Sequence, residues 1–287
     1  MLNNIKKTAI TSALVLAPFA AHATLTVDGV TFNPGDQFIT TSVWESVLSS
    51  SSQTLNGVGI VSQIDNAGGL GTTWLNGENG TQLTYYFSGY SVAKWYDLAG
   101  FSHLAGDDSG IGYNFATDAK SIDFTGGSVK IFSDNIANAS YTKLNPSAGG
   151  GSNALDIAKA TDGNLWLEYV GHTHTLIDAN LGARTGTLLG DVDGVNNIHQ
   201  GNKGTGYLDA IGGAVFGNFD TNSWDLLASG IADAKFEAKV SNTNSGPNWP
   251  LSGTASFKTT AIPEPGSLAL IALGLLGAGS FSRRRSA

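Results

Sequence analysis

The sequence predicts an all-β body, and we expect a single β-sandwich of the jelly-roll type. Apolar and polar residues alternate with period two in runs that recur about every dozen residues, between clusters of Gly, Asn and Asp, whereas helical periodicity is scarce. Glycine is abundant, at 38 residues, and aromatic residues make up 9% of the chain. This composition indicates a folded, turn-rich domain, because disordered chains have few aromatic residues.

The early strands of the body lie on either side of glycines. The clearest strand spans Gln82–Tyr96, and we expect it to bulge at Gly89. Two further strands, Ser121–Thr125 and Ser128–Phe132, flank Gly126-Gly127. A two-residue link of this kind suits a tight turn with positive φ, so these two strands predict a β-hairpin.

The later elements include three more strands and one short helix. Leu165–Val170 is mostly apolar and predicts a buried strand, while Ala234–Val240 and Gly253–Thr259 alternate small or apolar residues with Lys, Glu or hydroxyl residues. A short helix is expected around Ala154–Ala160. No segment rich in Pro or Ser divides the body, so residues 24–261 are predicted to form one domain.

Residues 1–23 have the pattern of a secretory signal peptide. Lys6 and Lys7 precede an apolar stretch over residues 9–20, and Ala21-His22-Ala23 supplies a small-x-small cleavage sequence. Signal peptidase is therefore expected to cut after Ala23, once the general secretory route has exported the body.

The C-terminal segment, residues 262–287, contains a proline-rich triplet, an apolar run and a basic end. Pro263 and Pro265 disfavour helix on either side of Glu264, which predicts an extended, protease-accessible hinge. The run Leu268–Phe281 carries no charge, and a helix of about 16 residues that includes it would reach roughly 24 Å, enough for a short transmembrane helix. The basic end, which is expected to stay on the cytoplasmic side and leave the body outside, consists of Arg283, Arg284 and Arg285.

This order of triplet, apolar helix and arginine cluster resembles the PEP-CTERM sorting signal of Gram-negative bacteria. The resemblance implies recognition by an exosortase, a membrane protease that removes the tail after transient anchoring in the inner membrane. The body would then be released or transferred to the cell surface. The alternative is an ordinary single-span tail anchor that is never cut.

Without its two terminal segments the chain is strongly acidic. The remaining body has 22 Asp and Glu against 10 Lys and Arg, a formal charge near −12. Such a surface disfavours nucleic acid and anionic lipid, and it favours divalent cations and cation-bridged anionic polysaccharide. The chain has no cysteine, which excludes disulfides, thiolate metal sites and thiol catalysis.

Several blocks of the body resemble a narrower group, the flocculation-associated PEP-CTERM proteins. These blocks are Gly77–Tyr90, Ser121–Asp134 and Gly206–Asn222. The resemblance implies a surface or extracellular-matrix protein that helps cells and exopolysaccharide to aggregate into flocs or biofilm. It carries no catalytic residues with it.

Two motifs could bind metal ions. Asp191-Val-Asp-Gly-Val-Asn-Asn197 presents oxygen ligands from Asp191, Asp193 and Asn197 around a glycine, as in the first part of a calcium loop, but it lacks a downstream bidentate Glu. The alternative is an Asx-rich turn between two strands. His172 and His174, at strand spacing, could begin a zinc or copper site with Asp178 as third ligand, or they could be exposed or paired across strands.

Two tryptophans are candidates for contacts with sugar rings. Trp74 lies beside glycines and Trp249 lies between Asn248 and Pro250, so both are predicted to be in loops where an indole face could be exposed.

Enzymatic motifs are absent from the sequence, although a spatially convergent carboxylate pair leaves no signature in sequence. The sequence thus predicts an exported, non-enzymatic surface or matrix protein without a required cofactor. The alternatives are a carbohydrate-binding module and, third, an extracellular hydrolase.

Overall fold

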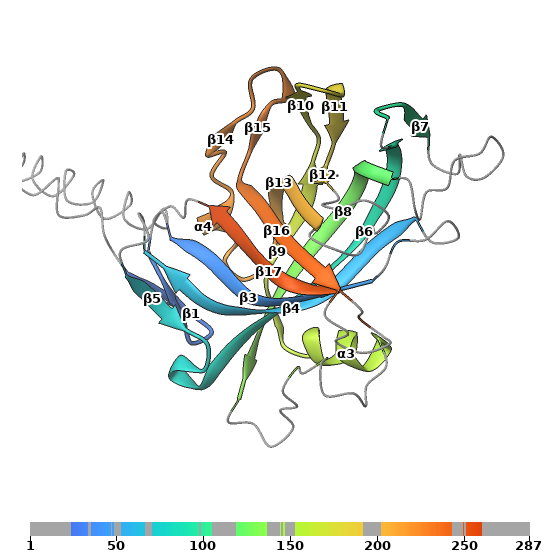
Figure 1. Ribbon diagram of the computed structural model, residues 1–287. Coiled ribbons are helices and arrows are strands. Elements are labelled where there is room, and N and C mark those ends of the chain that lie inside the picture. Colours follow the sequence, from blue (N-terminus) through green and yellow to red (C-terminus); the bar gives the residue numbers. More distant parts are fainter. Residues whose placement is uncertain are drawn as a thin grey trace, which may run out of the picture.

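The computed structural model describes residues 24–33, 36–46, 48, 53–66, 71–97, 99–104, 119–136, 144, 146, 153–191, 202–242, 249 and 251–259. This part of the chain is mostly β-structure, and its main sheet closes on itself (Figure 1). Eight antiparallel strands form the ring, in the order β8 (Ala119–Asn135), β9 (Asn164–His172), β13 (Asn202–Gly212), β16 (Ala234–Asn242), β17 (Leu251–Thr259), β3 (Gln37–Glu45), β4 (Thr54–Asp65) and β6 (Thr81–Asp97).

The pairing of β6 with β8 closes the ring and makes the fold an eight-stranded barrel. These two 17-residue strands pair from Thr81↔Asn135 to Asp97↔Ala119. The prediction of a sandwich was therefore wrong. Alternation of apolar and polar residues says only that each strand has one buried face, and that is equally true of two stacked sheets and of one closed sheet.

The predicted hairpin at Gly126-Gly127 was also wrong, because both glycines lie inside the continuous strand β8. Their φ angles are +72° and +91°, and Gly89 in the opposite strand β6 has a φ of +80°. A Cβ atom on Gly127 would lie 2.2 Å from the ring of Tyr90. The positive φ angles of the three glycines thus bend the two-stranded ribbon of β6 and β8, and at Gly126 and Gly127 a side chain would also have no room. The bulge predicted in the strand Gln82–Tyr96, which is part of β6, is confirmed at Gly89, where the register of β6 against β4 shifts.

The other predicted elements are confirmed as β9, β16, β17 and the helix α3 (Asn153–Ala160). The shorter strands are β1 (Leu25–Val27), β2 (Val30–Phe32), β5 (Thr72–Leu75), β7 (Ser102–Leu104), β10 (His174–Asp178), β11 (Gly182–Gly186), β12 (Leu188–Asp191), β14 (Trp224–Asp225) and β15 (Ile231–Ala232). Of these, β5, β7 and β12 pair with strands of the barrel, and the others form three separate two-stranded sheets, β1–β2, β10–β11 and β14–β15.

Short helical turns complete the described elements, namely α4 (Phe216–Phe219), η2 (Glu78–Gly80) and η4 (Leu227–Ser229).

One end of the barrel is filled by aromatic side chains. The rings of Phe32 and Phe38 meet Trp166 edge-on, each with a centroid distance of 5.6 Å, and Phe219 of α4 packs against all three. The Trp166 indole N–H donates to the Val27 carbonyl at 3.3 Å, which fixes the β1–β2 hairpin over this end. A closed apolar plug of this kind excludes water from the interior.

The middle of the barrel combines large residues with glycines. The rings of Tyr85 and Phe257 lie 5.6 Å apart, and a Cβ atom on Gly59 would lie 2.2 Å from the Tyr85 ring. Gly57 makes the same room for Phe87. Pairing an aromatic residue with a glycine on the next strand fills the narrow interior without overlap.

Helix α3 covers part of the outer surface of the barrel, below β4 in Figure 1. Trp44 and Val58 point outward from β3 and β4 and form a second apolar cluster with Ala160 and Trp249. The Thr84 hydroxyl of β6 donates to the Ala160 carbonyl at 2.8 Å and holds the end of the helix.

Candidate functional site

The residues of the predicted sorting and secretion signals lie outside the described residues. This applies to Ala21 and Ala23 of the signal-peptide cleavage sequence, and to Pro263, Glu264, Pro265, Arg283, Arg284 and Arg285 of the tail. Within the described part of the chain, no helix is long and apolar enough to cross a membrane.

The two tryptophans predicted to contact sugars are both fully buried, so that prediction was wrong. Trp74 lies in β5, opposite Ile64 of β4, and its exposed fraction is 0%. Trp249 is also 0% exposed, and its indole N–H donates to the Asp156 carboxylate of α3 at 2.9 Å. Local sequence suggested loops, but edge-strand pairing covers one indole and a helix from elsewhere in the chain covers the other.

Of the predicted calcium ligands, only Asp191 lies among the described residues. It ends β12, and one carboxylate oxygen accepts from Arg184 Nη1 at 2.7 Å and from Ser121 Oγ at 3.0 Å. A cation bound here would have to share this oxygen with a guanidinium. Asp193 and Asn197 lie outside the described part, so the calcium site stays a prediction.

The structure does not gather His172, His174 and Asp178 into a group of ligands, and among the described residues no group of three or more His, Asp or Glu side chains could hold a metal ion. His172 ends β9 and His174 begins β10. The His174 ring is buried and meets Tyr207 edge-on at 4.7 Å, and burial lowers its pKa. The two histidines thus have separate structural contacts.

Both ring nitrogens of His172 have acceptors. Nδ1 lies 2.8 Å from an Asp209 carboxylate oxygen, and Nε2 lies 2.8 Å from the Ser229 carbonyl oxygen. Only the imidazolium form donates from both nitrogens. Burial by itself lowers the pKa of His172, because it disfavours the charged ring. The hydrogen bonds to Asp209 and Ser229 have the larger combined effect, so the pKa of His172 is raised. This contact ties β9 and β13 to the turn that joins β14 to β15.

We expect the His172 contact to make stability depend on pH. The folded-state pKa lies above the unfolded value, so the contribution is complete below about pH 6.5 and is lost as the pH rises through the folded value. His172→Gln should cost on the order of 1 kcal/mol of unfolding free energy at pH 5.5 and much less at pH 9. Urea denaturation at both pH values measures this. An equal cost at both would contradict a charged His172.

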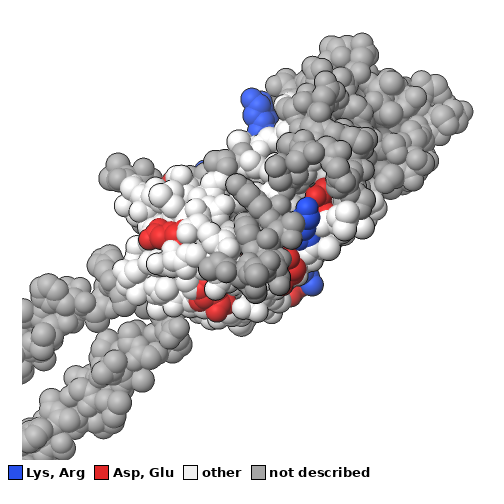
Figure 2. Space-filling view, turned by 90° about the horizontal axis from the view of Figure 1, so that it is seen from below, with Lys and Arg blue, Asp and Glu red and all other residues white. Residues whose placement is uncertain are grey.

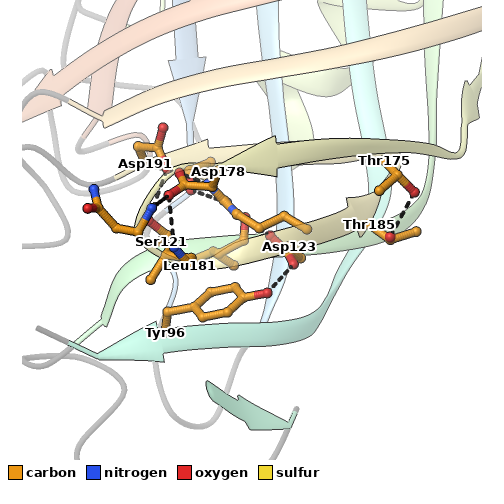
Figure 3. A network of polar contacts seen from close by, with 12 residues as sticks. Tyr96, Ser121, Asp123, Thr175, Asp178, Leu181, Thr185 and Asp191 are labelled. Atoms are coloured by element: carbon orange, nitrogen blue, oxygen red, sulfur yellow. Dashed lines mark hydrogen bonds and ion pairs between the residues drawn. The ribbon is translucent and has the colours of Figure 1, made fainter. Parts of the chain in front are cut away.

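Arg184 is a functional candidate that the sequence analysis missed, and it donates hydrogen bonds to Asp123 and Asp191, which are labelled in Figure 3. This β11 side chain is 1% exposed. Its Nε donates to Asp123 at 2.8 Å, its Nη1 donates to Asp191, and its Nη2 donates to the carbonyls of Ile122 and Gly190. The Tyr96 hydroxyl donates to the second Asp123 oxygen at 3.1 Å.

The Arg184 contacts join three elements. They fasten the β10–β11 hairpin to β8 and β12, at the end of the barrel where β12 takes the place of β9 between β8 and β13. Every nitrogen of the guanidinium has an acceptor, so the contacts satisfy it internally.

The exposed charges are dispersed. The face in Figure 2 carries acidic and basic side chains in small, separate groups among uncharged residues. On the outer surface of β16 and β17, Glu237 binds Lys235 and Lys258, each at 2.8 Å.

The barrel end opposite the aromatic plug contains a cavity of about 60 Å³. Its walls come from β6 and β8 and from the strands β3, β4, β12, β13, β16 and β17. They are mostly apolar and include Leu55, Phe87, Tyr90, Phe124, Phe236 and Leu251. A barrel of eight strands has an interior of the size that side chains can fill or that one small ligand can occupy.

Glu45, the last residue of β3, also lines this cavity. Its residue exposure is 7%, and in the part of the chain that the structure describes its carboxyl has no hydrogen-bond or ion-pair partner. Burial in this apolar surrounding raises the pKa of Glu45 to about 8. The group therefore holds its proton at neutral pH.

Comparison with known proteins finds one match to a family, described as the PEP-CTERM protein-sorting motif, over residues 261–285. The C-terminus carries a PEP-CTERM sorting motif. None of the curated proteins and none of the solved structures matches the chain.

The match confirms the resemblance of the tail to the PEP-CTERM sorting signal and implies that the protein is exported. Proteins with this motif are exported and sorted to the cell surface in Gram-negative bacteria, and the motif implies processing by an exosortase. The match covers the tail alone, so it supports export and sorting of the protein and gives no molecular function for the barrel.

Proposed function

We propose that the barrel is a non-enzymatic surface or extracellular-matrix protein that promotes exopolysaccharide-associated aggregation of cells, as in biofilms or flocs. The observation that carries this proposal is the PEP-CTERM motif at residues 261–285, which directs the body to the cell surface. The acidic body favours contacts with polysaccharide through bridging divalent cations.

Three buried aspartates of the barrel support a non-enzymatic role, because each has structural partners. Asp123 pairs with Arg184, and Asp156 accepts from the Trp249 indole. Asp233 accepts from three backbone N–H groups, those of Ala210, Thr221 and Asn222, at 2.6–2.8 Å. A carboxylate fixed in this way is a poor candidate for proton transfer to a substrate.

The alternative function is a carbohydrate-binding module. Trp74 and Trp249 do not support it, because both indoles are buried. No other observation on the described surface favours a single sugar, so weak, polyvalent and cation-dependent adhesion is the form of binding we propose.

Deleting the gene tests the role in aggregation. We expect the deletion strain to clump less while polysaccharide secretion stays intact, and we expect the wild-type gene to restore clumping. Unchanged clumping in the deletion strain would overturn the proposed role without affecting the sorting assignment.

Replacing both prolines of the triplet, Pro263→Ala with Pro265→Ala, tests the processing step separately. The unchanged chain should yield surface material that lacks Arg283, Arg284 and Arg285, as measured by mass spectrometry. The double variant should keep its tail and stay in the membrane fraction. Wild-type surface material that still carries the three arginines would contradict cleavage.

A further inference from the structure

Glu45 is the buried acid of the cavity at the barrel end opposite the aromatic plug, and among the described residues it has no hydrogen-bond or ion-pair partner. Three other polar side chains in its wall are engaged, and Lys203 is one of them. Ser46 exchanges two hydrogen bonds with the backbone of Asn56, each at 3.2 Å, and Asp191 binds Arg184 and Ser121. Glu45 alone presents an unengaged carboxyl to an apolar cavity, within the part of the chain that the structure describes.

A buried carboxyl without a partner is costly, and native proteins satisfy nearly all such groups. An ordered water molecule does not satisfy Glu45 well, because it needs two to four polar partners and the wall is mostly apolar, with Ser46, Asp191 and Lys203 already engaged. A molecule with an apolar body and one hydrogen-bonding group fits better. Its body would contact rings such as Phe87 and Phe124, while its polar group meets Glu45.

We propose that this cavity binds a small, uncharged, mostly apolar molecule whose single hydroxyl group pairs with the Glu45 carboxyl. The protonated carboxyl can donate one hydrogen bond and accept another, and a hydroxyl group does the same. This inference does not depend on the role in aggregation, since it concerns the interior of the barrel and not its surface.

The charge of the site selects against ionised ligands. An anionic head group would face the Glu45 carboxyl, and Lys203, the cationic side chain in the described wall, is already engaged. A cationic head group would ionise Glu45 and bring two charges into an apolar lining, and desolvation of both opposes this. The protonated state of Glu45 at neutral pH agrees with a neutral partner.

Three probes with the same ring and different head groups test the proposal by calorimetric titration of the full chain at pH 6.5. They are benzyl alcohol, benzylamine as its cation, and benzoate. We expect benzyl alcohol to bind at one site, and the two ions to bind at least tenfold more weakly. Absence of benzyl alcohol binding, or an ion that binds as tightly as the alcohol, would overturn the proposal.

Variants locate the binding. Glu45→Leu should weaken benzyl alcohol binding at least fivefold, and Ala238→Phe should abolish it by filling the cavity, with Ala238→Leu as a smaller filler if the first variant does not fold. Glu237→Gln, on the outer surface of the same barrel, is the matched control and should leave binding unchanged. Near-ultraviolet circular dichroism establishes folding of each variant. Binding that is unaffected by Glu45→Leu and by a folded filler variant would place the probe elsewhere and overturn the proposal.

Discussion

Replacing Arg184 with leucine is expected to lower the free energy of unfolding by roughly 3–5 kcal/mol. The substitution leaves Asp123, which is 1% exposed, as a buried charge whose remaining side-chain contact is the Tyr96 hydroxyl. It also frees the carbonyls of Ile122 and Gly190 from their donor. Most of the loss therefore comes from groups that stay buried without a partner, and urea denaturation measures it.

A second substitution separates this cause from lost packing. Arg184→Leu combined with Asp123→Leu removes both buried charges, and we expect the double variant to be more stable than Arg184→Leu alone. Lys130→Leu is the matched surface control, because Lys130 pairs with Glu168 at 3.1 Å with its side chain 43% exposed. It should cost less than about 1 kcal/mol. A double variant no more stable than Arg184→Leu would contradict the unpaired-charge explanation.

Replacing Glu45 with glutamine is expected to stabilise the protein at neutral pH. The folded-state pKa of about 8 exceeds the ordinary value of 4.5, so the folded chain keeps a proton that the unfolded chain releases. Between these values stability falls as the pH rises, by about 1.4 kcal/mol per pH unit at most. A glutamine side chain at this position carries no such penalty, so the gain should reach about 3 kcal/mol at pH 7 and vanish near pH 4.

Thermal unfolding of both proteins from pH 4 to pH 8 measures this effect. Glu237→Gln provides the comparison, because hydrogen bonds from Lys235 and Lys258 lower the pKa of Glu237. Its ionised form therefore favours the folded state above the unfolded pKa. The Glu237 variant should lose a little stability at pH 7, where the Glu45 variant gains. Parallel pH profiles for Glu45→Gln and the unchanged protein would contradict a buried, protonated Glu45.

The sequence located most elements of the barrel because their signals are local. Alternation along β16 and β17, and the long aromatic strand β6, indicate strands irrespective of what packs against them. The short helix α3 was predicted by the same kind of local pattern. The tail was recognisable for a similar reason, since a Pro-Glu-Pro triplet, an apolar run and three arginines act as a linear signal.

Closure of the sheet was decided only by tertiary structure. The pairing of β6 with β8 depends on a bend at Gly89 and Gly127, and the same two glycine-containing segments could equally have formed hairpins. The role of each tryptophan was decided in the same way. Trp249 became a core residue because α3, nearly a hundred residues earlier, brings Asp156 to its indole.

The functional features can also be separated into those that the sequence determines and those that only the tertiary structure reveals. Composition and the linear signals determined that this chain is an acidic, cysteine-free, exported protein. Only the closed barrel revealed that Glu45 is buried beside a cavity and that Arg184 joins three strands, because neither residue differs in its local sequence from an exposed one. Burial and ion pairing depend on which distant segments meet, and a one-dimensional pattern holds no information on that.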